Sequence, residues 1–332
     1  MAPGPTSDGR VTMLALSGGA DEGAYGAGLL TGWSQSGKRP DFTIVTGVST
    51  GALIAPFAFL GPSEDATISH LYTSISAKDV YHARFPLAIP GSTSAASTKP
   101  LARLIANAVT PAIVDRIAAE HRRGRRLFVG TANLDAQRMV IWDMGAIAAG
   151  MLPNRVALFR QILLGSSSIP AIFPPVVIDA VADGRPVREL HVDGGTSAQF
   201  LSVPRQLVID DAPAPDSTRL TLYLLVNNRL GGDFKLVKPK TIPILRRAFA
   251  LNQQSALLSL VGTSYLYAHE HGIGWNLSFI GNEVEASDTL FDTAYMRRLY
   301  AYGLARGQAG GKWRSRPPGG PEQATDATDT SR

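Results

Sequence analysis

Short runs of apolar residues alternate along the chain with segments whose apolar positions recur at helical spacing. The first run, residues 11–16, ends in a glycine-rich turn and leads into a helical segment at 24–33. The second run, residues 42–46, leads directly into a helical segment at 51–60. Continuous apolar runs of this length are typical of strands that are covered on both faces. Two consecutive strand-turn-helix units therefore predict a three-layer α/β/α fold with a mainly parallel central sheet.

The rest of the chain continues this alternation. A helical segment at 101–121 is interrupted near Pro111, because proline cannot donate a helix hydrogen bond. Residues 11–312 are expected to form one domain, with a flexible N-terminus at 1–10 and a disordered tail at 313–332, where too little apolar surface is available for burial. Further strands are predicted at 126–133, 138–143, 176–180, 188–192, 220–226 and 275–280, and further helices at 159–169, 242–271 and 293–306.

Composition narrows the chemistry that the chain can perform. The 332 residues are 45% hydrophobic, carry a formal net charge of +5 and include no cysteine, which excludes disulfides, thiolate catalysis and a cysteine-bound metal. Residues 1–10 lack the apolar core of a secretory signal, and no window approaches the roughly 18 apolar residues of a membrane span. The expected location is cytoplasmic by default, or secreted or membrane-associated if a native signal sequence has been removed.

Basic residues gather in two segments, 116–126 and 235–247. Such clusters are typical of solvated helix ends and loops; the alternative is peripheral contact with the phosphate head groups of a membrane. Nucleic acid is not an expected partner, because the clusters lack interleaved aromatic residues and no nucleic-acid-binding module surrounds them.

The pentapeptide Gly47-Val48-Ser49-Thr50-Gly51 lies between the second predicted strand and its helix. A serine at such a junction must make a sharp, strained turn, and the flanking glycines allow strand and helix to approach closely. The turn lifts the serine oxygen above the sheet, near the free amides at the start of the helix. Ser49 is therefore the candidate nucleophile.

A serine nucleophile also needs donors for the oxyanion that forms during attack. Residues 17–23, Ser-Gly-Gly-Ala-Asp-Glu-Gly, follow the first strand and open its helix, and an adjacent parallel strand would place their amides beside Ser49. A dinucleotide-binding loop is the competing interpretation, but Ala20 interrupts the glycine spacing that such loops require.

The general base has three candidates. Asp193 lies at the end of a predicted strand, before Gly194 and Gly195, where α/β sheets present functional groups. A buried carboxylate has a raised pKa and can act as a base without an imidazole, although the same three residues are also compatible with a plain turn. His191, on the same face of that strand, and His269, late in a helix, are the alternatives.

Taken together, these motifs resemble the patatin-like phospholipases over roughly residues 11–230. The resemblance implies a patatin-like fold and a serine acyl hydrolase that cleaves carboxylic esters of lipids, or small esters, through an acyl-enzyme intermediate. It implies Ser49 as nucleophile, Asp193 as base and the amides around Gly18, Gly19 and Ala20 as oxyanion hole, with no metal or cofactor. The motifs that carry it are 17–23, 47–51, 131–135, 166–175 and 193–195.

The sequence departs from the family pattern at two positions. Ala20 replaces a glycine and is expected to fit if its φ angle is negative, and Glu22 replaces a basic residue, which favours simple esters over phospholipid head groups. A Ser-His-Asp esterase that uses His191 or His269, and a catalytically inactive protein that binds lipid or membrane, remain the alternative functions.

Overall fold

The computed structural model describes residues 9–83, 94–182, 184–202, 219–232, 236–287 and 289–318. Within these residues, eight strands form one sheet in the order β10-β9-β1-β2-β5-β8-β7, and β6 pairs with β5 off this path. The strands are β1 Val11–Leu16, β2 Ile44–Val48, β5 Arg126–Asn133, β6 Arg138–Asp143, β7 Val176–Ala182, β8 Arg185–Asp193, β9 Leu220–Arg229 and β10 Gly274–Ile280. A separate two-stranded sheet joins β3 His82–Ala83 to β4 Ala96–Ser97.

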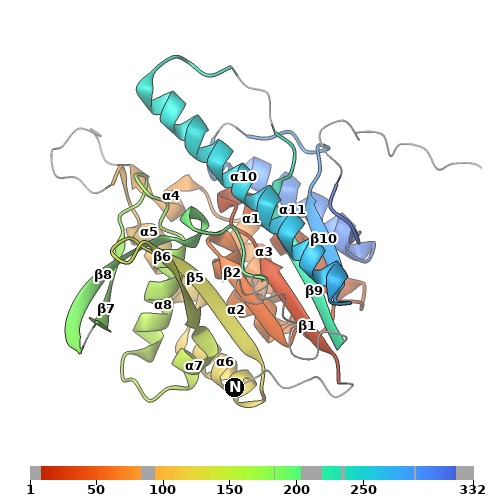
Figure 1. Cartoon of the computed structure of the whole chain (residues 1–332), viewed down its shortest axis with the longest axis horizontal. Helices are drawn as coiled ribbons and strands as arrows, with labels where there is room; N and C mark the ends of the chain where they lie inside the picture. Colours follow the sequence, from red (N-terminus) through yellow and green to blue (C-terminus); the bar gives the residue numbers. More distant parts are fainter. Residues whose placement is uncertain are drawn as a thin grey trace, which may run out of the picture.

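Helices cover both faces of the large sheet (Figure 1). They are α1 Gly23–Gln35, α2 Thr50–Leu60, α3 Asp65–Thr73, α4 Ala77–Val80, α5 Lys99–Ala108, α6 Pro111–Arg122, α7 Met144–Ala149, α8 Arg155–Ser166, α10 Thr241–Glu270 and α11 Thr293–Gln308. Over the described ranges, none of the helices combines the length and the apolar character needed to cross a membrane.

The centre of the sheet is parallel, as predicted. β1 pairs in parallel with both β2 and β9, β2 pairs in parallel with β5, and β9 pairs in parallel with β10. The antiparallel pairings join β5 to β6 and β8, and β7 to β8. This arrangement brings the ends of β1, β2 and β8 to neighbouring positions, which is where the candidate residues lie.

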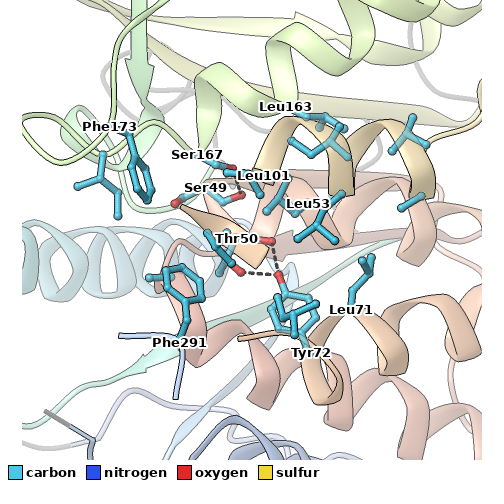
Figure 2. Close-up of a pocket in the computed structure, with 18 of the residues that line it drawn as sticks. Ser49, Thr50, Leu53, Leu71, Tyr72, Leu101, Leu163, Ser167, Phe173 and Phe291 are labelled. Atoms are coloured by element: carbon cyan, nitrogen blue, oxygen red, sulfur yellow. Dashed lines mark hydrogen bonds between the residues drawn. The ribbon is translucent and has the colours of Figure 1, made fainter. Parts of the chain in front are cut away.

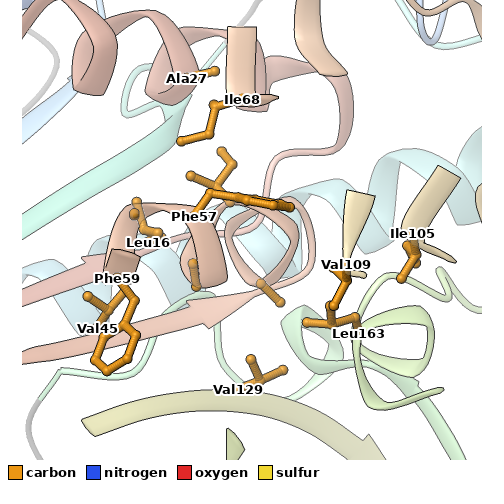
Figure 3. Close-up of a cluster of buried hydrophobic side chains, with 14 of the residues drawn as sticks. Leu16, Ala27, Val45, Phe57, Phe59, Ile68, Ile105, Val109, Val129 and Leu163 are labelled. Carbon is orange, nitrogen blue, oxygen red and sulfur yellow. The ribbon is translucent and has the colours of Figure 1, made fainter. Parts of the chain in front are cut away.

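The two faces of β1 belong to two different cores. Leu14 and Leu16 pack into the larger cluster with α1, α2, α8 and α11, while Met13 and Ala15 pack with β9, β10 and the C-terminal half of α10. Successive strand residues point to opposite faces, so a strand covered on both sides must be apolar throughout. Part of the larger cluster is drawn in Figure 3, where Leu16, Val45 and Phe57 lie between strands and helices. The predicted three-layer α/β/α architecture is confirmed.

The predicted interruption of the segment 101–121 is present, since α5 ends at Ala108 and α6 begins at Pro111. The predicted disordered tail begins too early, because Trp313 stacks against Trp33 and Tyr223, and Arg314 pairs with Leu277 of β10. Residues 319–332 and 1–8 lie outside the described part of the chain, so the predictions for them remain predictions.

Candidate active site

Ser49 occupies the sharp junction between β2 and α2. Its backbone adopts φ 56° and ψ −124°, a conformation that residues with a side chain rarely adopt. The flanking glycines permit the turn: a Cβ atom on Gly47 would overlap the backbone of Gly51, and one on Gly51 would overlap the carbonyl oxygens at the end of β1. The strained elbow that the sequence predicts is present.

The carboxylate of Asp193 lies directly against this serine. Asp193 is the last residue of β8, which pairs with β5, and its Oδ2 accepts a hydrogen bond from Ser49 Oγ at 2.5 Å. Its Oδ1 accepts a second bond from the Gly195 amide at 2.7 Å. Burial raises the pKa of Asp193 to about 6, although both hydrogen bonds act in the opposite direction. A carboxylate with this pKa is largely ionised at neutral pH and basic enough to accept a proton.

Two serines at the end of α8 hold the backbone of the elbow. The Ser49 amide donates to Ser166 Oγ at 3.0 Å, and Ser166 Oγ donates to the Gly130 carbonyl at 2.7 Å. Ser167 Oγ donates to the Ser49 carbonyl at 3.3 Å, a bond drawn in Figure 2. The sequence singles out the segment 166–175 but gives these serines no role. Their burial at the end of a helix is the signal that could have indicated one.

The glycine-rich loop after β1 lies beside the nucleophile. A Cβ atom on Gly18 would stand 3.3 Å from Ser49 Cβ, so the loop and the elbow are in contact. The Gly18 amide donates to the Gln199 carbonyl at 3.0 Å. By contrast, the amides of Gly19 and Ala20 donate to no other described residue, and they lie at the start of the turn that leads into α1. Unpaired amides at a helix start favour negative charge.

Ala20 adopts a φ of 50°, so the condition of a negative φ, under which alanine is expected to fit, is not met. The loop must reverse direction between β1 and the turn Ala20–Glu22, and the strained positions are Gly19, at φ 149°, and Ala20. A left-handed conformation costs a residue with a side chain about 1–2 kcal/mol. The surrounding loop contacts must offset that cost. A Cβ atom on Gly19 would overlap the Asn227 carbonyl, so that position has no room for a side chain.

Glu22 is paired with a cation from another strand. Arg229 Nη1, at the end of β9, lies 2.5 Å from Glu22 Oε1, and the Tyr295 hydroxyl donates to the same oxygen at 3.0 Å. Burial raises the pKa of Glu22 to about 6, while Arg229 lowers it. The negative charge of Glu22 in the glycine-rich loop is therefore balanced by the positive charge of Arg229. The sequence contains no short-range signal for this pairing, because the two residues are 207 positions apart.

Ser49 and Ala20 line a largely apolar pocket of about 730 Å³, a volume that includes the open space at its mouth. Its walls come from α2, α3, α5 and α8, with Phe173 and Phe291 near the serine (Figure 2). On the wall of the pocket, Thr50 Oγ1 and the Tyr72 hydroxyl lie 2.5 Å apart and form a hydrogen bond with each other. A pocket of this kind suits a flexible hydrocarbon chain.

The structure brings neither candidate histidine to Ser49. His191 is fully buried, with Nδ1 at 2.9 Å from Thr131 Oγ1 and Nε2 at 3.3 Å from Glu189 Oε2. Burial lowers its pKa. His269 is exposed on α10 and stacks on Tyr265. Across the residues with described positions, no group of three or more histidines, aspartates or glutamates could hold a metal ion.

Comparison with known proteins identifies the family. The sequence model of the family described as patatin-like phospholipase matches residues 14–204, a span that contains the glycine-rich loop, Ser49 and Asp193. The chain belongs to the patatin-like phospholipase family and is, in general terms, a lipid acyl hydrolase.

Two further comparisons carry no argument about the function of the chain. The crystal structure of VipD from Legionella pneumophila is similar to this chain, with 12% sequence identity, coverage of 93% of this chain and 70% of that chain, and a TM-score of 0.42. Comparison with curated proteins finds no significant match.

Proposed function

We propose that the protein hydrolyses carboxylic esters of lipids with a Ser49–Asp193 dyad, through an acyl-enzyme intermediate. The observation that carries this proposal is the 2.5 Å hydrogen bond from Ser49 Oγ to a buried carboxylate, at the wall of an apolar pocket. The hydrocarbon chain of the substrate occupies the pocket, and its ester carbonyl lies between Ser49 Oγ and the glycine-rich loop.

In the first half of the reaction, Ser49 Oγ attacks the carbonyl carbon while its proton passes to Asp193 Oδ2. The negative charge moves to the carbonyl oxygen, and the amides of Gly19 and Ala20 stabilise it; one such donor typically contributes about 3 kcal/mol. Gly18 joins them only if its amide gives up the Gln199 carbonyl. When the tetrahedral intermediate collapses, the alcohol departs with the proton from Asp193 and leaves an ester on Ser49.

In the second half, a water molecule attacks the acyl-Ser49 ester and gives its proton to Asp193. Collapse of this second intermediate returns the proton to Ser49 Oγ and releases the fatty acid. The same carboxylate thus acts as base and acid in turn, which a pKa of about 6 supports because neither form is strongly disfavoured near neutral pH.

The proposal is tested with chromogenic p-nitrophenyl esters of increasing chain length and with a phospholipid. Ser49→Ala and Asp193→Asn should each lower kcat/KM at least about a thousandfold, because both residues take part in the same transition state. Ser259→Ala and Asp179→Asn, which change exposed residues, are the matched controls and should retain full activity. Near-normal turnover by a folded dyad variant would refute the dyad.

The same assays separate the alternatives. A Ser-His-Asp esterase would lose several orders of magnitude of activity in His191→Gln or His269→Ala, whereas the dyad predicts little change in His269→Ala. A protein that only binds lipid would turn over no ester and would not react with a fluorophosphonate. Peripheral membrane contact also forms part of the proposal, since the substrates of a lipid hydrolase reside in membranes.

A further inference from the structure

The two halves of α10 lie in different environments. The C-terminal half packs Leu257 and Val261 into the core with β9 and β10. In the N-terminal half, Ile244 is 51% exposed and Leu251 is 66% exposed, and Figure 1 shows this end of the helix extending beyond the other elements. A helix that leaves large apolar side chains in water over several turns has a surface suited to a partner.

The exposed apolar residues are spread around the N-terminal half of the helix. Ile244 and Leu251 lie on one side at a spacing of seven residues, and Leu245 and Phe249, 59% and 44% exposed, lie on another. The exposed Leu236 and Val237 precede the helix. We name residues 236–258 the docking segment.

The docking segment also carries an unbalanced charge. Residues 236–258 include four basic residues, Lys238, Lys240, Arg246 and Arg247, and no aspartate or glutamate. A segment with both exposed apolar and basic residues is typical of helices that lie in the interface of an anionic membrane.

In the other basic cluster, residues 116–126, three arginines form ion pairs. Arg116 is paired with Glu64, and both Arg123 and Arg125 are paired with Glu120. Its charges are therefore largely used within the fold, which supports the solvated-helix interpretation for residues 116–126.

The docking segment is connected to the loop beside the candidate active site. The side chain of Gln253 is hydrogen-bonded to that of Gln199, whose carbonyl accepts the Gly18 amide. Two hydrogen bonds therefore link the docking segment to the glycine-rich loop beside Ser49.

We propose that the docking segment binds an anionic lipid bilayer, with its apolar residues among the acyl chains and its lysines at the phosphates. This inference rests on the proposed function, since it explains how a lipid ester reaches Ser49. The charge favours a bilayer over a second copy of the chain, because two docking segments would bring like charges together.

Binding is measured by co-sedimentation with vesicles of diether phosphatidylcholine, with or without diether phosphatidylglycerol, which contain no ester to cleave. The charge variant Lys238→Gln/Lys240→Gln should bind the anionic vesicles about 30-fold more weakly. The apolar variant Ile244→Asn/Leu251→Asn should bind about tenfold more weakly or less well still.

Two matched controls carry comparable chemical changes elsewhere. Arg122→Gln/Arg123→Gln alters exposed arginines in the other basic cluster, and Met151→Asn/Leu152→Asn alters exposed apolar residues. Both should bind as the wild type does. All four variants should hydrolyse a soluble short-chain ester within about twofold of the wild-type rate, since surface substitutions rarely disturb the fold.

The outcomes are separable. Undiminished vesicle binding by both docking-segment variants, or a loss confined to the controls, overturns the inference. So does a dimer in analytical ultracentrifugation that only the apolar variant abolishes, which would assign the surface to a second copy. If the wild type binds vesicles but cleaves no ester, the proposed function fails and the docking surface stands. If it hydrolyses soluble esters but binds no vesicles, the docking surface fails and the proposed function stands.

Discussion

Replacing Asp193 by asparagine should make the folded protein more stable at pH 8 while it removes activity. The folded carboxyl has a pKa of about 6, against 3.8 for an aspartate in contact with solvent in the unfolded chain, because the fold buries it. At about 1.36 kcal/mol per pKa unit, the ionised carboxylate destabilises the native state by about 3 kcal/mol at pH 8. Asparagine has a similar shape and can keep the Gly195 hydrogen bond without the buried charge.

The pH dependence follows from the direction of the change. Because the folded carboxyl holds its proton more tightly than the unfolded one, wild-type stability falls as the pH rises from about 4 to about 6 and stays lower above that range. The advantage of Asp193→Asn should therefore be about 2–3 kcal/mol at pH 8 and close to zero at pH 4.

Urea unfolding, followed by tryptophan fluorescence and far-ultraviolet circular dichroism at the two pH values, measures this difference, provided that the m value is unchanged. Asp179→Asn is the control, since its carboxylate is 90% exposed and should change stability by less than about 0.5 kcal/mol. A variant that is less stable than the wild type at pH 8, or an advantage of equal size at both pH values, would refute the reasoning.

Three further outcomes are expected. The kcat/KM of the wild type should decline as the pH falls below about 6, because protonated Asp193 cannot accept the proton of the nucleophile; a pH-rate profile with no limb near that value would contradict this. Ala108→Trp, which fills part of the pocket, should lower turnover of long-chain p-nitrophenyl esters about tenfold or more and leave the acetate ester unaffected; equal effects on both would remove the pocket from chain binding. Arg229→Met should destabilise the protein by about 2 kcal/mol at pH 8 in urea unfolding, since it removes the cation that balances a partly buried carboxylate, and a second change, Glu22→Gln, should restore most of the loss.

The central sheet and the positions of Ser49 and Asp193 within it are predictable from the sequence because their signals are local. The predicted strands 126–133 and 138–143 coincide with β5 and β6, and the serine motif falls between β2 and α2 as expected. A glycine on each side of a serine, and an aspartate at a strand end, are features of short stretches of sequence. Their meeting depends on the pairing of β5 with both β2 and β8, which the first two strand-turn-helix units do not determine.

Other features depend on contacts between distant segments, and these contacts cannot be inferred from the local patterns of a single sequence. The pairing of Glu22 with Arg229, the pocket walls supplied by α5 and α8, and the bonds from Ser166 to the elbow are of this kind. The positive φ of Ala20 is also set by its surroundings, because alanine itself disfavours that conformation. Likewise, Trp313 is ordered by a tertiary contact with Trp33 that the composition of its own segment does not suggest.

The central claim, that Ser49 is a nucleophile activated by Asp193, is tested most directly by labelling with a fluorophosphonate followed by peptide mass spectrometry. A single adduct on Ser49 is predicted, absent from Ser49→Ala and formed at least about a thousandfold more slowly in Asp193→Asn. An adduct on another serine, or labelling of Asp193→Asn at the wild-type rate, would contradict the dyad.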